Sequence, residues 1–166
     1  GTNTWSGLPI AVGALGTALA SWPLARLMNR SGRRPGLALG YGLAVIGSLL
    51  AMMGVAGGSF WLLLGGMALF GIASTSNLLA RYAAADVTSP AHRGRAMGLI
   101  VWGSTIGSII GPNLMAPALR LGALLGVSSV ASAFLIAVGS YALASLLIEL
   151  FLRPDPLAIA RHSQAI

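Results

Sequence analysis

The sequence predicts an all-α integral membrane protein, a polytopic bundle of helices, from its composition and its charge pattern. Hydrophobic residues make up 56% of the 166 residues and charged residues only 8%, whereas a soluble domain has about 25% charged residues. Continuous apolar runs favour helices over barrel strands, in which polar and apolar residues alternate. The uncharged runs are Gly1–Ala25, Pro35–Ala80, Ala96–Leu119 and Leu121–Ile148.

The lengths of these runs predict five membrane-spanning helices. A helix needs about 20 apolar residues to cross the hydrocarbon core, so the run from Pro35 to Ala80 is long enough for two spans. The glycine-rich stretch from Gly54 to Ser59 supplies the break between them. Pro112 predicts a bend in the fourth span, because proline removes a backbone hydrogen bond. The expected spans are residues 7–27, 37–56, 60–82, 96–117 and 124–150.

Glycines recur at spacings that place small residues on one helix face. This pattern indicates close contact between the backbones of neighbouring membrane helices. The pairs and triplet that show it are Gly36/Gly40, Gly103/Gly107/Gly111 and Gly122/Gly126.

The arginines predict the orientation of the chain. With five spans, one side of the membrane carries nine of the ten basic residues, and Arg120 lies alone on the other side. The positive-inside rule places the nine in the cytoplasm, so we expect a multi-pass protein of the cell (inner) membrane of a bacterium. The basic residues lie in short turns beside apolar spans, so the lipid bilayer is the partner that explains the net charge of +7. We expect no nucleic acid as a partner. The nine are Arg26, Arg30, Arg33, Arg34, Arg81, Arg93, Arg95, Arg153 and Arg161.

The turn from Ala25 to Leu37 resembles the signature between the second and third helices of the major facilitator superfamily, roughly G-x-L-A-D-R-x-G-R-R-x-x-L. Among the departures from that signature, Ala25 stands in place of glycine and Asn29 in place of aspartate. The matching residues are Leu27, Arg30, Gly32, Arg33, Arg34 and Leu37.

Two further segments are similar to motifs of the same family. Residues 83–98 look like its turn between helices four and five, and residues 107–112 are similar to the glycine-proline motif of its drug:proton antiporter branch through Gly107, Gly111 and Pro112. The trailing glycine pair of that motif is absent. The resemblance covers the chain as helices two to six. It implies that residues 1–152 form the amino-terminal half-bundle without its first helix, and that 153–166 begin the cytoplasmic linker. The partners implied are that first helix and the carboxy-terminal half.

The resemblance also implies a conformational switch at the cytoplasmic end. In the family, an arginine at the position of Arg33 pairs with an acid at the position of Asp86 and helps to close this end. The alternative is that Arg33 only sets topology and contacts lipid phosphate. Gly32 allows a positive φ for a tight reversal, whereas Asn29 brings no charge to a helix dipole. The switch residues are Asn29, Arg30, Gly32, Arg33, Arg34 and Asp86.

Polar residues within the spans mark a candidate substrate cavity. Substrate sites of such transporters lie near the bilayer midplane, where Asn77 offers an amide and Trp102 a flat apolar face. The alternative for small polar side chains is hydrogen bonding between helices. Antiporters of the family often carry an arginine on helix four, where this chain has Met67. Glu149 and Arg153 have the spacing of a local ion pair.

The predicted function is secondary transport of small molecules by alternating access, as proton-coupled efflux of drug-like or amphipathic compounds. One alternative is uptake of a small metabolite or sugar, and another is a truncated membrane protein that acts through helix packing. The chain has no cysteine and no cluster with metal-ligand or catalytic spacing. We therefore expect no enzyme activity, no cofactor and no metal.

Overall fold

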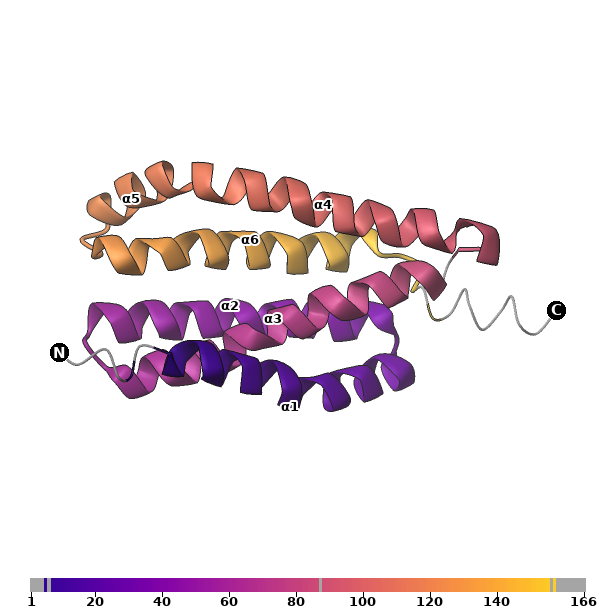
Figure 1. Ribbon diagram of the computed structural model, residues 1–166, viewed down its shortest axis with the longest axis horizontal. Helices are drawn as coiled ribbons and strands as arrows, with labels where there is room; N and C mark the ends of the chain where they lie inside the picture. Colours follow the sequence, from indigo (N-terminus) through magenta and orange to yellow (C-terminus); the bar gives the residue numbers. More distant parts are fainter. Residues whose placement is uncertain (1–4, 6, 87, 156, 158–166) are drawn as a thin grey trace.

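The structure is a computed structural model that describes residue 5, residues 7–86, residues 88–155 and residue 157. Within these ranges the regular elements are all helices, which confirms the predicted all-α class (Figure 1). The elements are α1 (Leu8–Ser31), α2 (Arg33–Ala56), α3 (Phe60–Asp86), the one-turn 3-10 helix η2 (Pro90–His92), α4 (Arg93–Asn113), α5 (Met115–Leu124) and α6 (Ser129–Phe151).

The lengths and hydropathies of the helices fit a polytopic membrane bundle. Helices α1, α2, α3 and α6 are each long and apolar enough to cross a membrane. Helices α4 and α5 pass the same test as a pair, with a bend of 50° between them. Counting that pair as one broken span gives the predicted number of five spans.

The structure corrects the bounds of the last two expected spans. The fourth was expected as one helix over 96–117, but α4 ends at Asn113, one residue after Pro112, and α5 continues to Leu124. The fifth was expected to begin at residue 124, but α6 begins at Ser129. A turn precedes it, with Gly126 at φ 68°, and the hydroxyl of Ser128 accepts a hydrogen bond from the amide of Ala131 as the helix cap.

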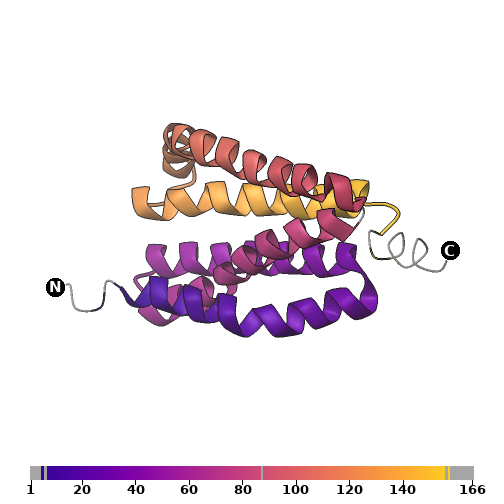
Figure 2. The same cartoon turned by 45° about the vertical axis from the view of Figure 1, so that its right-hand side comes forward.

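Helix α2 is the central helix of the described bundle. It packs against α3 along one side and against α6 along another, and α3 in turn packs against α1. Figures 1 and 2 both show α1, α2 and α3 as one group, with α6 next to α2 and with α4 on the far side of α6. Helix α4 has no buried residue, so it stands at the edge of the described bundle.

Glycines let the central helices approach closely, as predicted for the first pair. A Cβ added at Gly36 would overlap the side chain of Met28 on α1, and one at Gly40 would overlap the hydroxyl of Ser76 on α3. Gly122 lies in the same way against Ser132 on α6. Gly126 belongs instead to the turn before α6. The triplet on α4, which includes Gly107, faces open space, so the described part of the chain shows no partner for that face.

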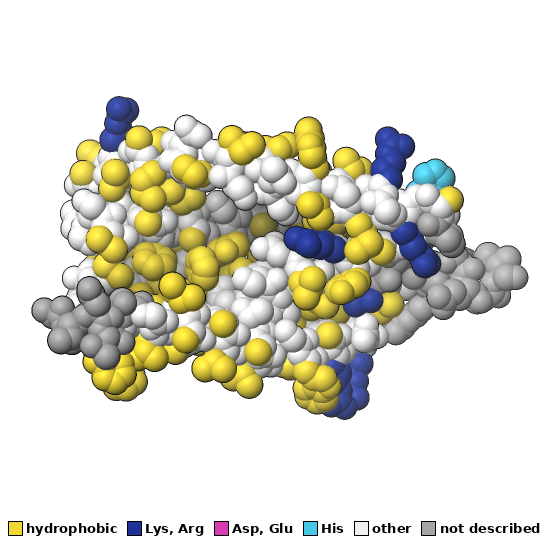
Figure 3. Space-filling model, in the orientation of Figure 1, with side chains coloured by type: hydrophobic (Ala, Val, Ile, Leu, Met, Phe, Trp, Pro, Cys, Tyr) yellow, Lys and Arg dark blue, Asp and Glu magenta, His cyan; other side chains and the backbone are white. Residues whose placement is uncertain are grey.

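Basic side chains gather at one end of the bundle (Figure 3). The carboxyl ends of α1, α3 and α6 lie at this end, together with the amino ends of α2 and α4, because consecutive spans run in opposite directions. Arg120 lies on α5 near the other end. The described arginines are therefore distributed as the predicted topology requires, and Arg161 lies outside the described residues.

Candidate functional site

The candidate site is the reversal between α1 and α2 at the arginine-rich end. Gly32 is the single residue between the two helices, and its backbone has φ 112° and ψ 162°. Its amide donates a hydrogen bond to the carbonyl of Met28, at 3.1 Å. A side chain is disfavoured at such a φ, and a Cβ at Gly32 would also overlap the carboxylate of Asp155. The predicted positive φ at Gly32 is confirmed.

Asp155 caps the amino terminus of α2 from far along the sequence. Its carboxylate oxygens accept hydrogen bonds from the backbone amides of Arg33, at 3.0 Å, and Arg34, at 2.8 Å. The first amides of a helix have no partner within the helix, and a negative charge there is favoured by the helix dipole. A third amide, that of Leu157, donates to the same carboxylate at 2.8 Å. The segment after α6 is therefore fastened to the turn.

Arg34 makes a second connection, between the start of α2 and the carboxyl end of α6. Its Nη2 donates to the carboxylate of Glu149 in an ion pair and to the backbone carbonyl of the same residue, at 2.9 Å. A cation near the carboxyl end of a helix is stabilised by the helix dipole. The expected pairing of Glu149 with Arg153 is wrong, because the acid reaches across to α2 instead.

Sequence reasoning missed Asp155. Residues 153–166 were assigned to a linker, and nothing in that assignment linked Asp155 to α2. The available signal was an imbalance of charge: the first turn of α2 holds two arginines and no acid, and no side chain of its own caps it. An unassigned acid elsewhere on the same side of the membrane was therefore the candidate cap.

The other predicted switch residues lie at the same end. Asn29 and Arg30 are exposed on the last turn of α1. Asp86 is the last residue of α3, but its side chain lies outside the described residues, so its pairing with Arg33 stays a prediction. Both residues are at the arginine-rich end of the bundle, as that pairing requires.

The two candidate cavity residues lie on different helices, α3 and α4, and no described hydrogen bond or ring contact joins them. Asn77, on α3, accepts a hydrogen bond at its Oδ1 from the hydroxyl of Tyr41 on α2, at 2.6 Å. Tyr41 also stacks on Tyr141 of α6, with ring centroids 6.2 Å apart. Trp102 lies on α4 and is 66% exposed. The described contacts therefore support an interhelical role for Asn77 and leave its place in a cavity as a prediction.

The antiporter-like motif lies where the fourth span bends. Pro112 is in the last turn of α4, just before the break, and a Cβ added at either Gly107 or Gly111 would meet nothing within 4 Å. The motif therefore lies on an uncovered helix face next to the bend of 50°. It binds nothing that the structure describes.

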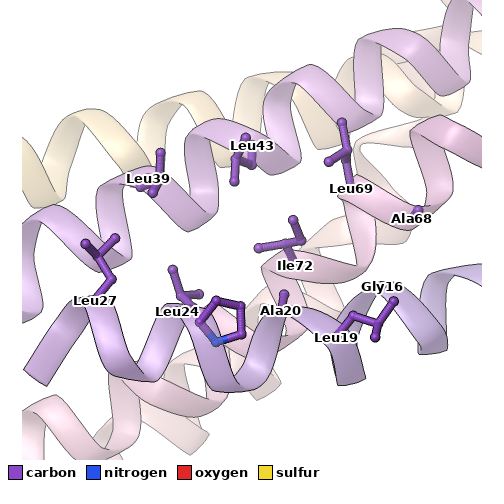
Figure 4. A pocket seen from close by; sticks show the side chains of 11 residues that line it. Gly16, Leu19, Ala20, Leu24, Leu27, Leu39, Leu43, Ala68, Leu69 and Ile72 are labelled. Atoms are coloured by element: carbon purple, nitrogen blue, oxygen red, sulfur yellow. The ribbon is translucent and has the colours of Figure 1, made fainter.

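An apolar groove lies beside the turn, between α1 and α2 with α3 as its floor (Figure 4). Its volume is about 540 Å³. Leu24 and Leu27 of α1 face Leu39 and Leu43 of α2 across it, and Ile72 of α3 contributes to the floor. The lining of the groove is therefore apolar.

Comparisons with known proteins agree with the geometry. The model of the family described as Major Facilitator Superfamily matches residues 2–165. The chain is 34% identical over 165 residues to the uncharacterized MFS-type transporter YdeG of Bacillus subtilis (strain 168), covering 99% of this chain and 38% of that protein. It is 29% identical over 160 residues to the uncharacterized MFS-type transporter YddS of the same strain, covering 96% of this chain and 37% of that protein.

A third relative has a named substrate. The chain is 29% identical over 108 residues to the riboflavin transporter RfnT of Brucella anthropi, covering 65% of this chain and 27% of that protein. No solved structure matches. The chain spans less than two-fifths of the length of each of these relatives. The match to the family model over nearly the whole chain shows that this chain belongs to the major facilitator superfamily of membrane transporters.

Proposed function

We propose that this chain is the amino-terminal half, without its first helix, of a secondary transporter that moves small molecules by alternating access. The observation that carries the proposal is the set of contacts at the arginine turn. Arg34 ties α2 to α6 through Glu149, and Asp155 ties the segment after α6 to the start of α2. These contacts support a half that moves as one body, which is the motion that alternating access requires.

The same contacts support a cytoplasmic gate built around the turn. With the amino terminus of α2 capped by Asp155, the turn has a fixed geometry from which Arg33 can reach the end of α3. Closure then forms the pairing of Arg33 with Asp86, and opening breaks it. Asn29 is exposed near the end of α1 and brings no charge there, so closure at this end is weaker than with aspartate at that position.

The proposed transport mode is proton-coupled efflux of drug-like or amphipathic compounds from the cytoplasm across the cell membrane. The resemblance of Gly107, Gly111 and Pro112 to the antiporter motif supports it. The proton carrier lies outside this chain, because the position expected for a helix-four arginine holds Met67. Uptake of a metabolite is the second candidate, and the similarity to a riboflavin transporter favours it.

Transport by the whole protein separates these candidates. The full-length protein is expressed in a bacterial strain that lacks its major efflux pumps and its riboflavin uptake, and both ethidium accumulation and labelled riboflavin uptake are measured. Efflux predicts low ethidium accumulation that rises when a protonophore is added. Riboflavin uptake with unchanged ethidium accumulation identifies the second candidate. Absence of both activities in a correctly inserted protein, across a panel of amphipathic dyes and vitamins, contradicts the proposed function.

A further inference from the structure

We propose that the groove between α1 and α2 is a binding site for one acyl chain of an anionic phospholipid, whose phosphate is held by Arg30 and Arg26. The groove is lined by apolar residues (Figure 4). Arg30, on the last turn of α1, lies beyond Leu27 at the end of the groove, and Arg26 lies one turn before Arg30 in a neighbouring recess. The site is separate from the contacts made by Glu149 and Asp155.

The dimensions of the groove fit an extended hydrocarbon chain. Along α1 it extends from Gly16 to Leu27, which corresponds to about 16 Å at the helical rise of about 1.5 Å per residue. A volume of about 540 Å³ over that length gives a mean cross-section of about 33 Å². The groove is therefore long and narrow, as an extended acyl chain is.

The charge at the end of the groove specifies the headgroup. Arg30 lies three residues beyond Leu27, so it continues the groove-lining face of α1 into the membrane interface. It also borders a second recess of about 380 Å³ on the outer side of α1, together with Arg26 and Trp22. Arg30 is thus the residue at which the acyl groove and the basic recess meet.

Trp22 fixes one wall of that recess. The Arg26 guanidinium lies 5.0 Å from the centre of the Trp22 ring, a cation–π contact that holds the charge at the level where tryptophan anchors to the membrane interface. The two acids whose side chains are described at this end do not contact Arg26 or Arg30. Glu149 pairs with Arg34, and Asp155 accepts hydrogen bonds from backbone amides. Guanidinium groups bind phosphate through paired hydrogen bonds, so a lipid phosphate satisfies both arginines.

Headgroup charge decides which lipid occupies the groove. Lipid tails are as apolar as leucine, so an acyl chain gains little hydrophobic energy by leaving the bilayer for the groove. Attraction between an arginine at the membrane surface and anionic lipid changes occupancy by about fivefold for each arginine. Phosphatidylglycerol is therefore expected in the groove in preference to phosphatidylcholine, by at least about fivefold.

Photo-crosslinking of the full-length protein tests the site. The protein is reconstituted in vesicles that contain trace phosphatidylglycerol or phosphatidylcholine with a diazirine in the acyl chain, and the labelled residues are mapped by mass spectrometry. We expect phosphatidylglycerol to label the groove residues at least about fivefold more than phosphatidylcholine does. Arg30→Gln should reduce that labelling by about fivefold, and Arg30→Lys should retain most of it. Arg93→Gln, the same charge change at an exposed position of α4, should leave it unchanged.

A second pair of variants tests the groove itself. Ala20→Phe fills the groove and should abolish labelling there, whereas Ala18→Phe, on an exposed position of α1 outside the groove, should not. Equal labelling by the two lipids shows ordinary solvation by the bilayer and overturns the proposal. Absence of label from the groove with either lipid shows that another part of the protein covers it, and this also overturns the proposal.

Discussion

Replacing Asp155 by alanine should uncover the first backbone amides of α2. The carboxylate accepts hydrogen bonds from the amides of Arg33, at 3.0 Å, and Arg34, at 2.8 Å. No carbonyl within the helix can replace it, because the first four amides of a helix lie beyond the reach of the helical hydrogen bonds. We therefore expect the Asp155 carboxylate to protect both amides from hydrogen exchange.

The cost of this substitution follows from the exposure of the cap. Hydrogen bonds to a charged group contribute about 1.5–3 kcal/mol each, but Asp155 is half-buried, so water replaces part of what is lost. Removal of a helix cap costs about 0.5–2 kcal/mol. We expect about 1–2 kcal/mol for Asp155→Ala, equivalent to about a 5- to 30-fold change in an equilibrium constant. Asp155→Asn keeps one acceptor without the charge and should lie between.

Hydrogen exchange measured on the full-length protein in detergent reports this change directly. Mass spectrometry with residue-level fragmentation should show exchange at the amides of Arg33 and Arg34 about 5- to 30-fold faster in Asp155→Ala. Glu149→Gln is the matched control, because it removes an acid from the same end but leaves the cap in place. Unchanged exchange at both amides in Asp155→Ala would refute the assignment of the cap.

Three further predictions concern the stability of the full-length protein in detergent. Gly32→Ala should lower the free energy of unfolding by about 1–2 kcal/mol, because Gly32 has a φ of 112°. Gly42→Ala is the control and should not lower it, because a Cβ at Gly42 would meet open space. A lower melting temperature for Gly42→Ala than for Gly32→Ala counts against the turn geometry. Gly66→Ala should also destabilise, since its Cβ would overlap the backbone of α2, and a melting temperature equal to that of Gly42→Ala contradicts that packing. A double-mutant cycle of Arg34→Gln and Glu149→Gln should give a coupling below about 1 kcal/mol, because the two side chains are 26% and 45% exposed; a coupling above about 3 kcal/mol would show a buried pair.

The fold was readable from the sequence because lipid imposes simple rules on length and charge. Uncharged runs between arginine clusters predicted five spans, and the structure has helices at each of them. The turn at Gly32 was predictable because its φ value is one that glycine adopts readily. The end of α4 was not placed correctly, because the uncharged run continues past Pro112 to Leu119 and only backbone geometry separates α4 from α5.

The contacts of the acidic residues Glu149 and Asp155 were harder to predict from the sequence, because they join residues far apart in the chain. Glu149 lies four residues from Arg153, so local spacing favoured a pair that the structure does not form. Its observed partner, Arg34, lies more than one hundred positions away. Asp155 follows the same rule, since a cap for α2 comes from beyond the end of α6. Charge imbalance at a helix end is a useful signal for such contacts, but it does not name the partner.

Accessibility of the transport path from each side of the membrane tests alternating access most directly. Asn77→Cys is introduced into full-length protein without other cysteines, and labelling by a membrane-impermeant maleimide is measured in right-side-out and inside-out vesicles. Alternating access predicts labelling from both sides. Adding Asn29→Asp should reduce labelling from the arginine-rich side, because a negative charge strengthens closure there. Labelling from one side alone, unaltered by Asn29→Asp, would contradict alternating access through this half.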